Sequence, residues 1–550
     1  MPDSEATLGK ITGTSILGYA SVETRGKAFR ALNPATGEQI EPQFYSATDS
    51  DIKQAALLAE RAFPEWSHAS GKTKGALLRK IADNIESIAG DLVGRATQET
   101  ALTEPRIKSE TARTCFQLRM FAQLVEEGSW IGARIDQADP NRTPLPKPDI
   151  RSLWRAIGPV AVFCASNFPL AYSVAGVDTS SALAAGNPVV VKAHGAHPGT
   201  AELVGHAIRE AARECHAPEG VFSLLFDAGI DVGISLVKHP SIKAVGFTGS
   251  KEGGRALMDT AASRPVPIPV YAEMGSINPV FILPGAMRER AAEIAKGAHA
   301  SVTLAAGQFC TKPGIIITPA DSSSGAPSRE FISQFRDLMR SSDDFTLLTS
   351  RIHQSYLLNT KARGSERGVS TLAQPEIAPA AGLHVGPTLF ETTASAFIGD
   401  PKLHSEIFGP STMLVTHSSR EELLQLARSL EGHLTASIHG TEQDLHDYAD
   451  LVAILESKVG RLIFNGYPTG LEVCPAVVHG GPYPATSDGR STSVGTRAIY
   501  RFARLVCFQN FPGSALPDEL KDENPLAIWR LVNGEFTRAA LSSKTRATSR

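Results

Sequence analysis

Short apolar runs alternate with longer amphipathic segments in the part of the chain that follows residue 158. The runs are strand-sized and rich in valine, so they predict buried β-strands at residues 160–163, 188–192, 221–226 and 244–247. The segments between them have apolar residues at helical spacing and predict helices at residues 171–185, 198–214, 232–238 and 252–262. Strands that alternate with helices in this way predict an α/β fold with a doubly wound parallel sheet.

The flanking regions also have regular patterns. Before the repeated units, residues 48–51 offer capping side chains for a helix over 52–62, and two longer amphipathic helices are expected at 73–101 and 106–127. In the second half, the pattern predicts a helix at 287–304 and strands at 314–318, 412–415 and 461–464. Strands and helices therefore alternate in the second half as well, and two doubly wound domains are expected.

Composition is ordinary for a soluble globular protein, with 42% hydrophobic and 20% charged residues in a chain of 550. This length is enough for two or three domains. The net charge is only −3, and lysines and arginines are scattered, so no nucleic-acid partner is expected. No apolar run approaches the length that spans a bilayer, so no membrane partner is expected either.

Six cysteines occur without a C-x-x-C pair, which makes a disulfide framework or a metal site an unfavourable interpretation. Reduced thiols indicate a cytoplasmic setting. The N-terminal residues are acidic and lack an apolar segment, so no signal peptide is expected there.

Cys310 lies between the predicted helix at 287–304 and the predicted strand at 314–318, at a break in regular structure. Most free cysteines are inert core residues, and that alternative stays open for Cys310 alone. Glu273 and Asn167 each follow an apolar strand segment as well. A thiol, a carboxylate and an amide at strand ends suggest a nucleophile, a base and an oxyanion donor.

At these residues the chain resembles the aldehyde dehydrogenase superfamily. The resemblance extends from the Asn-Pro-Ala-Thr-Gly-Glu motif at 33–38 to Phe-Gln-Asn-Phe-Pro at 508–512. Ala-Glu-Met-Gly-Ser-Ile-Asn-Pro at 272–279 and Gly-Gln-Phe-Cys at 307–310 are similar to the branch of 2,5-dioxovalerate (α-ketoglutaric semialdehyde) dehydrogenases and their NADP-linked fatty-aldehyde relatives.

The resemblance implies two doubly wound α/β domains and a β-ribbon that joins subunits into a homodimer or homotetramer. Residues 1–132 and 157–284 would bind the dinucleotide, and residues 285–480 would form the catalytic domain. Residues 133–156 and 481–513 would form the oligomerisation or bridging element, and residues 514–550 a C-terminal tail.

A glycine-rich turn at residues 246–254 joins a predicted strand to a predicted helix. Glycines allow a close approach of the backbone, and a helix start offers N–H groups to a phosphate, although an ordinary tight turn has the same composition. The resemblance implies that Ser250 touches the pyrophosphate. Gly246, Gly249 and Gly254 complete this predicted cofactor turn.

Lys192 ends a predicted strand, where it is either a solvated lysine or, as the resemblance implies, a ligand of the adenine ribose. Many NAD-preferring members have a glutamate three residues later, but this chain has Gly195. The absence of an acid removes repulsion against a 2′-phosphate, so NADP is expected as the preferred cofactor, with NAD also accepted.

Glu406 and Phe408 belong to a Glu-x-Phe-Gly-Pro turn. The resemblance implies that Glu406 binds the nicotinamide ribose and that Phe408 backs the nicotinamide ring. His479 is a second base candidate in a His-Gly-Gly-Pro stretch that the fatty-aldehyde branch shares. The alternative for His479, a surface or packing residue in a glycine-rich loop, stays open.

The expected reaction is oxidation of a small-molecule aldehyde through a thioester on Cys310. The oxyanion would be stabilised by Asn167 and a backbone N–H, with Glu273 as the base. The resemblance favours 2,5-dioxovalerate as substrate, with fatty or other aldehydes as the alternative. A cofactor-independent thiol hydrolase, a non-catalytic protein and a dehydrogenase that passes the thioester to coenzyme A remain as rivals.

Overall fold

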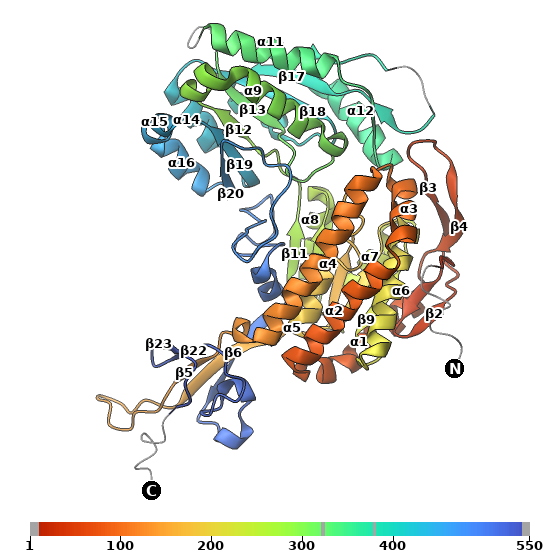
Figure 1. Cartoon of the computed structure of the whole chain (residues 1–550), viewed down its shortest axis with the longest axis vertical. Helices are drawn as coiled ribbons and strands as arrows, with labels where there is room; N and C mark the ends of the chain where they lie inside the picture. The colour runs from red at the N-terminus through yellow and green to blue at the C-terminus, as the bar shows by residue number, and fades with distance from the viewer. Residues whose placement is uncertain (1–9, 321–324, 378–380, 542–550) are drawn as a thin grey trace.

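Two α/β lobes lie against each other, and a narrow β arm projects away from them (Figure 1). The structure, a computed structural model, describes residues 10–320, 325–377 and 381–541. Each lobe is built around one seven-stranded sheet. The predicted α/β architecture with two doubly wound domains is thus confirmed.

The sheet of the first lobe has the strand order β11-β10-β7-β8-β9-β1-β2. Its parallel strands are β7 (Val160–Phe163), β8 (Val189–Lys192), β9 (Phe222–Leu225), β10 (Ala244–Thr248) and β11 (Val270–Glu273). At one edge, β1 (Ser15–Leu17) and β2 (Ala20–Val22) add antiparallel pairs. The four strands that the hydrophobic pattern predicts in this lobe are confirmed.

Helices cover both faces of this sheet because successive side chains of a strand point to opposite sides. One hydrophobic core includes Val160 and Val162, whereas a second includes Ala161 and Phe163. The first core is shared with α2 (Gly71–Ser87), α4 (Glu104–Glu127), α5 (Val177–Ala185) and α6 (Pro198–Glu214). The second is shared with α1 (Asp49–His68), α7 (Asp231–Lys238) and α8 (Lys251–Ala262).

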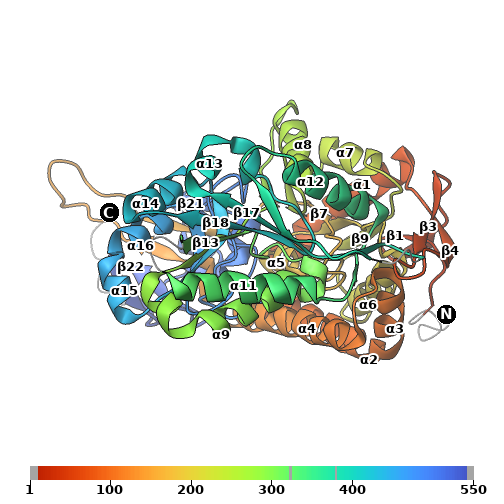
Figure 2. The same ribbon diagram turned by 90° about the horizontal axis from the view of Figure 1, so that it is seen from above.

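The second lobe repeats this plan with the order β15-β17-β18-β13-β12-β19-β20. Its strands are β12 (Val280–Ile282), β13 (Ile315–Pro319), β15 (Ser370–Ala373), β17 (Thr388–Thr393), β18 (Ser411–His417), β19 (His433–His439) and β20 (Val459–Phe464). In Figure 2, α9 (Pro284–Thr303) and α11 (Ala326–Arg340) run together along one face. Among the described residues, the other α-helices of this lobe are α12 (Ser350–Gly364), α13 (Ala394–Gly399), α14 (Arg420–Ser429), α15 (Glu442–Asp447) and α16 (Ala449–Glu456).

The arm is a five-stranded sheet that joins distant parts of the chain. Its strands are β5 (Arg134–Asp136), β6 (Ile150–Ala156), β21 (Ala503–Gln509), β22 (Arg530–Val532) and β23 (Glu535–Thr537). The last two strands belong to the predicted C-terminal tail, and β22 pairs with β5 in parallel. Two small sheets pair β3 (Ala28–Leu32) with β4 (Gln39–Tyr45) and β14 (Phe345–Thr346) with β16 (His384–Val385).

One predicted helix begins later than its pattern indicates. The sequence predicts helix from Ala171, but α5 begins at Val177. The N–H groups of Leu170 and Ala171 both donate to Glu110 Oε1, at 3.0 and 2.9 Å, and Gly176 is extended. A buried carboxylate therefore takes the N–H groups of this segment and holds it as a turn.

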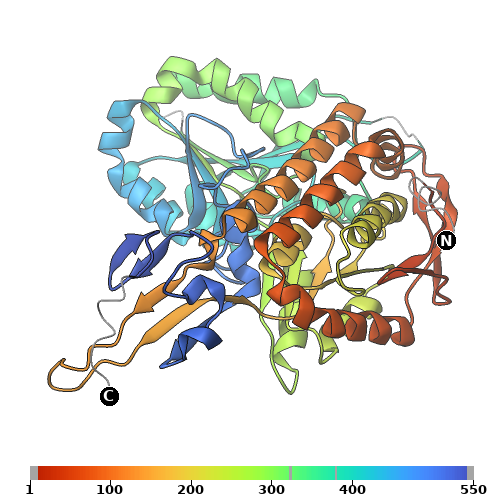
Figure 3. The same cartoon turned by 60° about the horizontal axis from the view of Figure 1, so that its bottom comes forward.

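The helix predicted at 73–101 is two helices, α2 and α3 (Ala89–Thr100), which meet at Ile88. Ile88 has φ −104° and ψ 14°, outside helical geometry, and its side chain is buried in the first core. The amphipathic pattern continues across this break because both helices pack against the same core. Figure 3 shows α2 beside α4 on the first lobe.

Within the described residues, no helix combines the length and apolar character needed to cross a membrane.

The predicted cap of the helix over 52–62 is a capping box in which Thr48 and Asp51 exchange hydrogen bonds at the start of α1. Thr48→Ala removes this cap, so we expect a loss of about 1 kcal/mol in unfolding free energy. Denaturant titration measures the loss, and Thr48→Ser, which keeps the hydroxyl, serves as the control. Equal stability of Thr48→Ala and the parent chain would show that the cap contributes nothing.

Candidate active site

The segment before Cys310 has an unusual backbone. After α9 ends, Ala305, Ala306 and Gly307 have φ values of 48°, 59° and 64°, in the left-handed region. Left-handed alanines are unfavourable and persist only where surrounding contacts impose them. A side chain at Gly307 would lie 2.3 Å from Gly409 O, so the loop needs glycine there.

Side-chain hydrogen bonds hold this loop from both sides. Asn278 Nδ2 donates to the carbonyls of Cys310 and Lys312, at 2.9 and 3.0 Å. Gln308 Oε1 accepts from the Leu348 backbone N–H at 3.0 Å. The cysteine therefore lies on a loop that is fixed by neighbours distant in sequence, which suits a reactive group that must stay in position.

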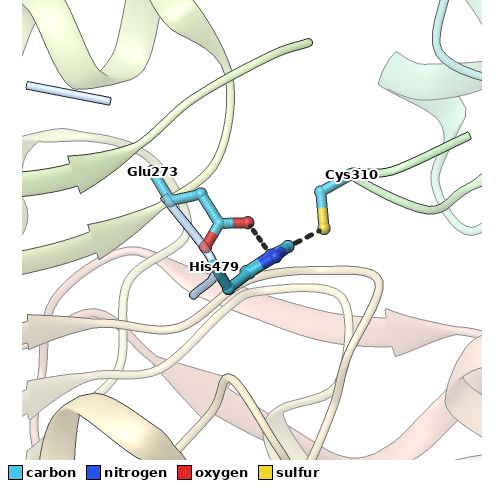
Figure 4. A group of neighbouring side chains, drawn as sticks. All are labelled: Glu273, Cys310 and His479. Carbon is cyan, nitrogen blue, oxygen red and sulfur yellow. Dashed lines mark hydrogen bonds and ion pairs between the residues drawn. The ribbon is translucent and has the colours of Figure 1, made fainter. Parts of the chain in front are cut away.

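Three side chains form the centre of the site (Figure 4). His479 Nε2 lies 3.4 Å from Cys310 Sγ and 2.9 Å from Glu273 Oε1. Ser493 Oγ donates to the other oxygen, Glu273 Oε2, at 2.6 Å. His479 and Glu273 are 1% and 4% exposed, so the network is shielded from bulk water. The sequence-predicted thiol, carboxylate and histidine are thus brought together, and His479 is not a surface residue.

The environment of Glu273 favours the ionised carboxylate. Burial acts to raise its pKa, but the charge and hydrogen bond of His479 and the hydrogen bond from Ser493 lower it below its ordinary value. A carboxylate and a proton on His479 Nε2 satisfy the short contact between them. Glu273 is therefore available as a proton acceptor.

The environment of Cys310 favours the neutral thiol. Burial raises its pKa well above the ordinary value, and the charge of Glu273 raises it further. The guanidinium of Arg113 acts in the opposite direction. The Cys310 side chain is consequently held as a thiol with a carboxylate and an imidazole in reach, and it would have to lose a proton to act as a nucleophile.

The ligand atoms of Glu273, Cys310 and His479 all lie within 4.8 Å of one another, which is also compatible with a metal ion. Zinc accepts this set of donors. The same separations suit groups that share protons, and a metal would consume the lone pairs that the thiol and base need. The prediction that no metal takes part stays a prediction.

Asn167 lies beside the cysteine loop. Its Nδ2 donates to Gln308 O at 2.9 Å. An amide nitrogen carries two N–H groups, so one remains for another acceptor. The structure thus brings the predicted oxyanion donor to the same place as Cys310.

The carboxyl end of β8 carries Lys192, whose Nζ lies 3.9 Å from Asp227 Oδ2. Burial lowers the pKa of Lys192, and the Asp227 carboxylate opposes that effect. A side chain at Gly195 would meet Asp227 O at 3.4 Å, so Gly195 lies beside the same residue. Asp227 was not predicted from the sequence, because a single acid after a strand has no distinctive pattern.

The glycine-rich turn lies next to the strand of Glu273. Gly249 N donates to Glu273 O at 3.0 Å, and Ser250 caps α8 by accepting from Gly253 N at 3.1 Å. Gly246 lies against Asp178 and Gly254 against Met274, so packing accounts for these two glycines. Ser250 and the start of α8 are the parts of the turn that can face a phosphate.

Glu406 reaches the segment that follows Glu273. A side chain at Gly275 would lie 2.3 Å from Glu406 Oε2, which shows how closely the carboxylate approaches the backbone. Burial raises the pKa of Glu406, and the charge of Lys312 opposes this effect. Phe408 lies two residues later in the same turn and is partly buried.

The chain belongs to the aldehyde dehydrogenase family, because the model described as "Aldehyde dehydrogenase family" matches residues 21–482. It is 44% identical over 527 residues to alpha-ketoglutaric semialdehyde dehydrogenase 2 of Azospirillum brasilense, covering 96% of this chain and 99% of the relative. It is 43% identical over 530 residues to alpha-ketoglutaric semialdehyde dehydrogenase of Acinetobacter baylyi, with 96% and 99% coverage.

Solved structures share the fold at low identity. A 1-pyrroline-5-carboxylate dehydrogenase has a TM-score of 0.76 at 19% identity, covering 90% of this chain and 92% of its own. Betaine aldehyde dehydrogenase from Staphylococcus aureus, in complex with NAD+, has a TM-score of 0.76 at 20% identity, covering 92% and 96%.

Removal of the Glu273 charge tests the electrostatic state of the thiol. We expect Glu273→Gln to lower the pKa of Cys310 and to speed its alkylation by iodoacetamide several-fold at pH 8 without cofactor, since the repelling carboxylate is gone. Mass spectrometry of the Cys310 peptide over time measures the rate. Slower alkylation would mean that the carboxylate activates the resting thiol instead of suppressing its ionisation.

Proposed function

We propose that this protein is an NADP-preferring aldehyde dehydrogenase that oxidises 2,5-dioxovalerate to 2-oxoglutarate. The observation that carries the proposal is the contact of Cys310 Sγ with His479 Nε2, which also pairs with Glu273. The names of the two relatives support this substrate over a fatty aldehyde. 2,5-Dioxovalerate has an aldehyde at one end and a 2-oxo acid at the other. Oxidation of the aldehyde to a carboxylic acid gives 2-oxoglutarate.

Cys310 begins the reaction by losing its proton to the Glu273–His479 pair. The thiolate adds to the aldehyde carbon, and the second N–H of Asn167 and the Cys310 backbone N–H stabilise the resulting oxyanion. A bound nicotinamide dinucleotide supplies a hydride acceptor. Collapse of the oxyanion with loss of hydride leaves an acyl group on Cys310 as a thioester.

Glu273 then serves hydrolysis of the thioester. A carboxylate with a lowered pKa is a proton acceptor at neutral pH, and it can take a proton from water. His479 holds Oε1 of this carboxylate and Ser493 holds Oε2, so the base has a fixed direction. Release of the acid returns Cys310 to the thiol.

The cofactor proposal rests on the edge of the first sheet. Lys192, Ser250 and the start of α8 offer a cation, a hydroxyl and backbone N–H groups to a dinucleotide. The Staphylococcus aureus neighbour is described with NAD+, which supports a nicotinamide cofactor. Gly195 supports NADP because no carboxylate extends from that position. The Asp227 carboxylate lies beside Lys192 and limits the preference for NADP over NAD, so NAD remains a cofactor.

We infer a homodimer or homotetramer that forms through the arm. Leu505, Trp529 and Phe536 lie on arm strands or next to them and are 59%, 49% and 75% exposed. Exposed apolar side chains on a projecting sheet suit subunit contacts. All six cysteines are free thiols, which supports a cytoplasmic location.

Substitutions separate the two halves of the reaction. Cys310→Ala should abolish dehydrogenase turnover while NADP binding, measured by fluorescence titration, persists. Glu273→Gln should give a burst of reduced cofactor followed by a stall, because His479 remains to take the thiol proton, so the thioester forms but is hydrolysed slowly. Stopped-flow absorbance resolves the two phases. Full turnover of Cys310→Ala or an unchanged steady rate of Glu273→Gln would contradict these roles.

Gly195→Glu tests cofactor choice. A carboxylate beside the 2′-phosphate should lower kcat/KM for NADP by about tenfold while kcat/KM for NAD changes little. Gly90→Glu, at a position where an added Cβ meets no atom within 4 Å, is the matched control. Equal losses with both cofactors would show a general disturbance and would count against Gly195 as the selector.

A further inference from the structure

Arg113 on α4 is a cation with unused hydrogen-bonding capacity. Its Nε and Nη2 atoms are buried and have no hydrogen-bond partner among the residues that the structure describes. A buried donor without an acceptor is costly, and a guanidinium is especially so because it stays charged. Such a group is stable when an anion completes its surroundings.

Arg106, on the same helix, differs from Arg113 in having a carboxylate partner, although its Nε is also buried without a hydrogen-bond partner in the described chain. Its Nη1 lies 2.9 Å from Glu110 Oε2. Its guanidinium stacks over Phe168 and Phe309, with the carbon Cζ 4.6 and 5.2 Å from the ring centroids. Arg113 also lies over Phe168, at 5.7 Å, but has no comparable carboxylate contact there.

Aromatic rings connect Arg113 to the reacting groups. Arg113 Cζ lies 5.6 Å from the Tyr172 ring centroid, and that ring lies 6.2 Å from the His479 ring. On the other side, Phe168 lies 5.3 Å from Phe309, which precedes Cys310 in the chain. A short molecule bound to Cys310 along these rings would end near the Arg113 guanidinium.

Arg461 on β20 adds a second positive charge to the same region. Its Nη2 donates to Pro468 O at 2.8 Å, and its buried Nε has no hydrogen-bond partner in the described chain. Burial lowers the pKa of Arg461, while negative charge at Cys310 or Tyr172 would raise it. The hydrogen bonds of Arg461 within the described chain go to backbone carbonyl groups, which do not neutralise its charge.

We propose that Arg113, assisted by the field of Arg461, binds the carboxylate of a 2-oxo acid aldehyde whose aldehyde carbon lies at Cys310. This inference rests on the proposed function and names the group that recognises the end of the substrate remote from the reaction. The planar guanidinium can pair with both oxygens of a carboxylate. The apolar rings of Phe168 and Tyr172 contact the chain between the two ends. A neutral aldehyde of the same length would leave the Arg113 donors unpaired.

The first experiment compares 2,5-dioxovalerate with pentanal, a neutral aldehyde of the same chain length. The wild-type enzyme should have a higher kcat/KM for the charged substrate. Arg113→Gln should lower kcat/KM for 2,5-dioxovalerate by about 10- to 100-fold, mainly through KM, and leave kcat/KM for pentanal within about twofold. Arg113→Lys should give an intermediate KM, because the positive charge remains but the planar guanidinium that can pair with both carboxylate oxygens is lost.

Two outcomes separate the two proposals. A wild-type enzyme that prefers pentanal would overturn the proposed substrate. A wild-type preference for 2,5-dioxovalerate together with equal losses on both substrates in Arg113→Gln would overturn the role of Arg113 alone. Arg288→Gln, which removes the same charge from an exposed position on α9, is the matched control and should change neither value.

A second measurement does not need turnover. Glutarate, a dicarboxylate without an aldehyde, should slow iodoacetamide alkylation of Cys310 in the wild-type enzyme by occupying the site. Arg113→Gln should need at least tenfold more glutarate for the same protection. Equal protection in the two proteins would overturn the carboxylate site, even if the substitution lowers activity through a disturbed fold.

Discussion

The short contact of His479 with Glu273 is the interaction on which the rest of the site depends. It joins a strand end of the first lobe to a loop more than two hundred positions later, and it fixes the imidazole against the sulfur of Cys310. Burial makes this contact strong and also makes its loss expensive, because a carboxylate would be left without a partner. The lobes and the loop between residues 479 and 493 therefore have to assemble before any of the three groups has its proper surroundings.

The same contact places a negative charge near Cys310, which disfavours the thiolate, and the surrounding cations reduce this effect. A carboxylate close to a thiol opposes thiolate formation, and burial adds to that opposition. Arg113 and Arg461 supply positive charge from helix α4 and strand β20, in different lobes. Substrate that brings its own carboxylate to Arg113 would neutralise part of that charge. A substrate carboxylate at Arg113 would therefore oppose thiolate formation further, so the proton of Cys310 has to leave through the Glu273–His479 pair.

Local patterns predicted the parts of the structure whose stability is local. The helix at Pro198–Glu214 has its predicted bounds because a proline at its start and an apolar stripe specify it without help. The start of α5 was predicted wrongly because Glu110, on another helix, takes the N–H groups of Leu170 and Ala171. No window of sequence around residue 171 contains that carboxylate.

The site residues also divide into those that the local sequence predicts and those that depend on partners distant in sequence. Cys310, Glu273 and Asn167 could be predicted because each stands at a strand end or at a break in regular structure, where parallel sheets place their ligands. His479 stayed ambiguous because its partner lies far away in sequence. Arg113 was missed since an arginine on an amphipathic helix normally marks the solvent side. Only the packing of α4 against Phe168 and Tyr172 turns that arginine inward, and two of its buried nitrogens have no hydrogen-bond partner among the described residues, which is the basis for the proposed binding role.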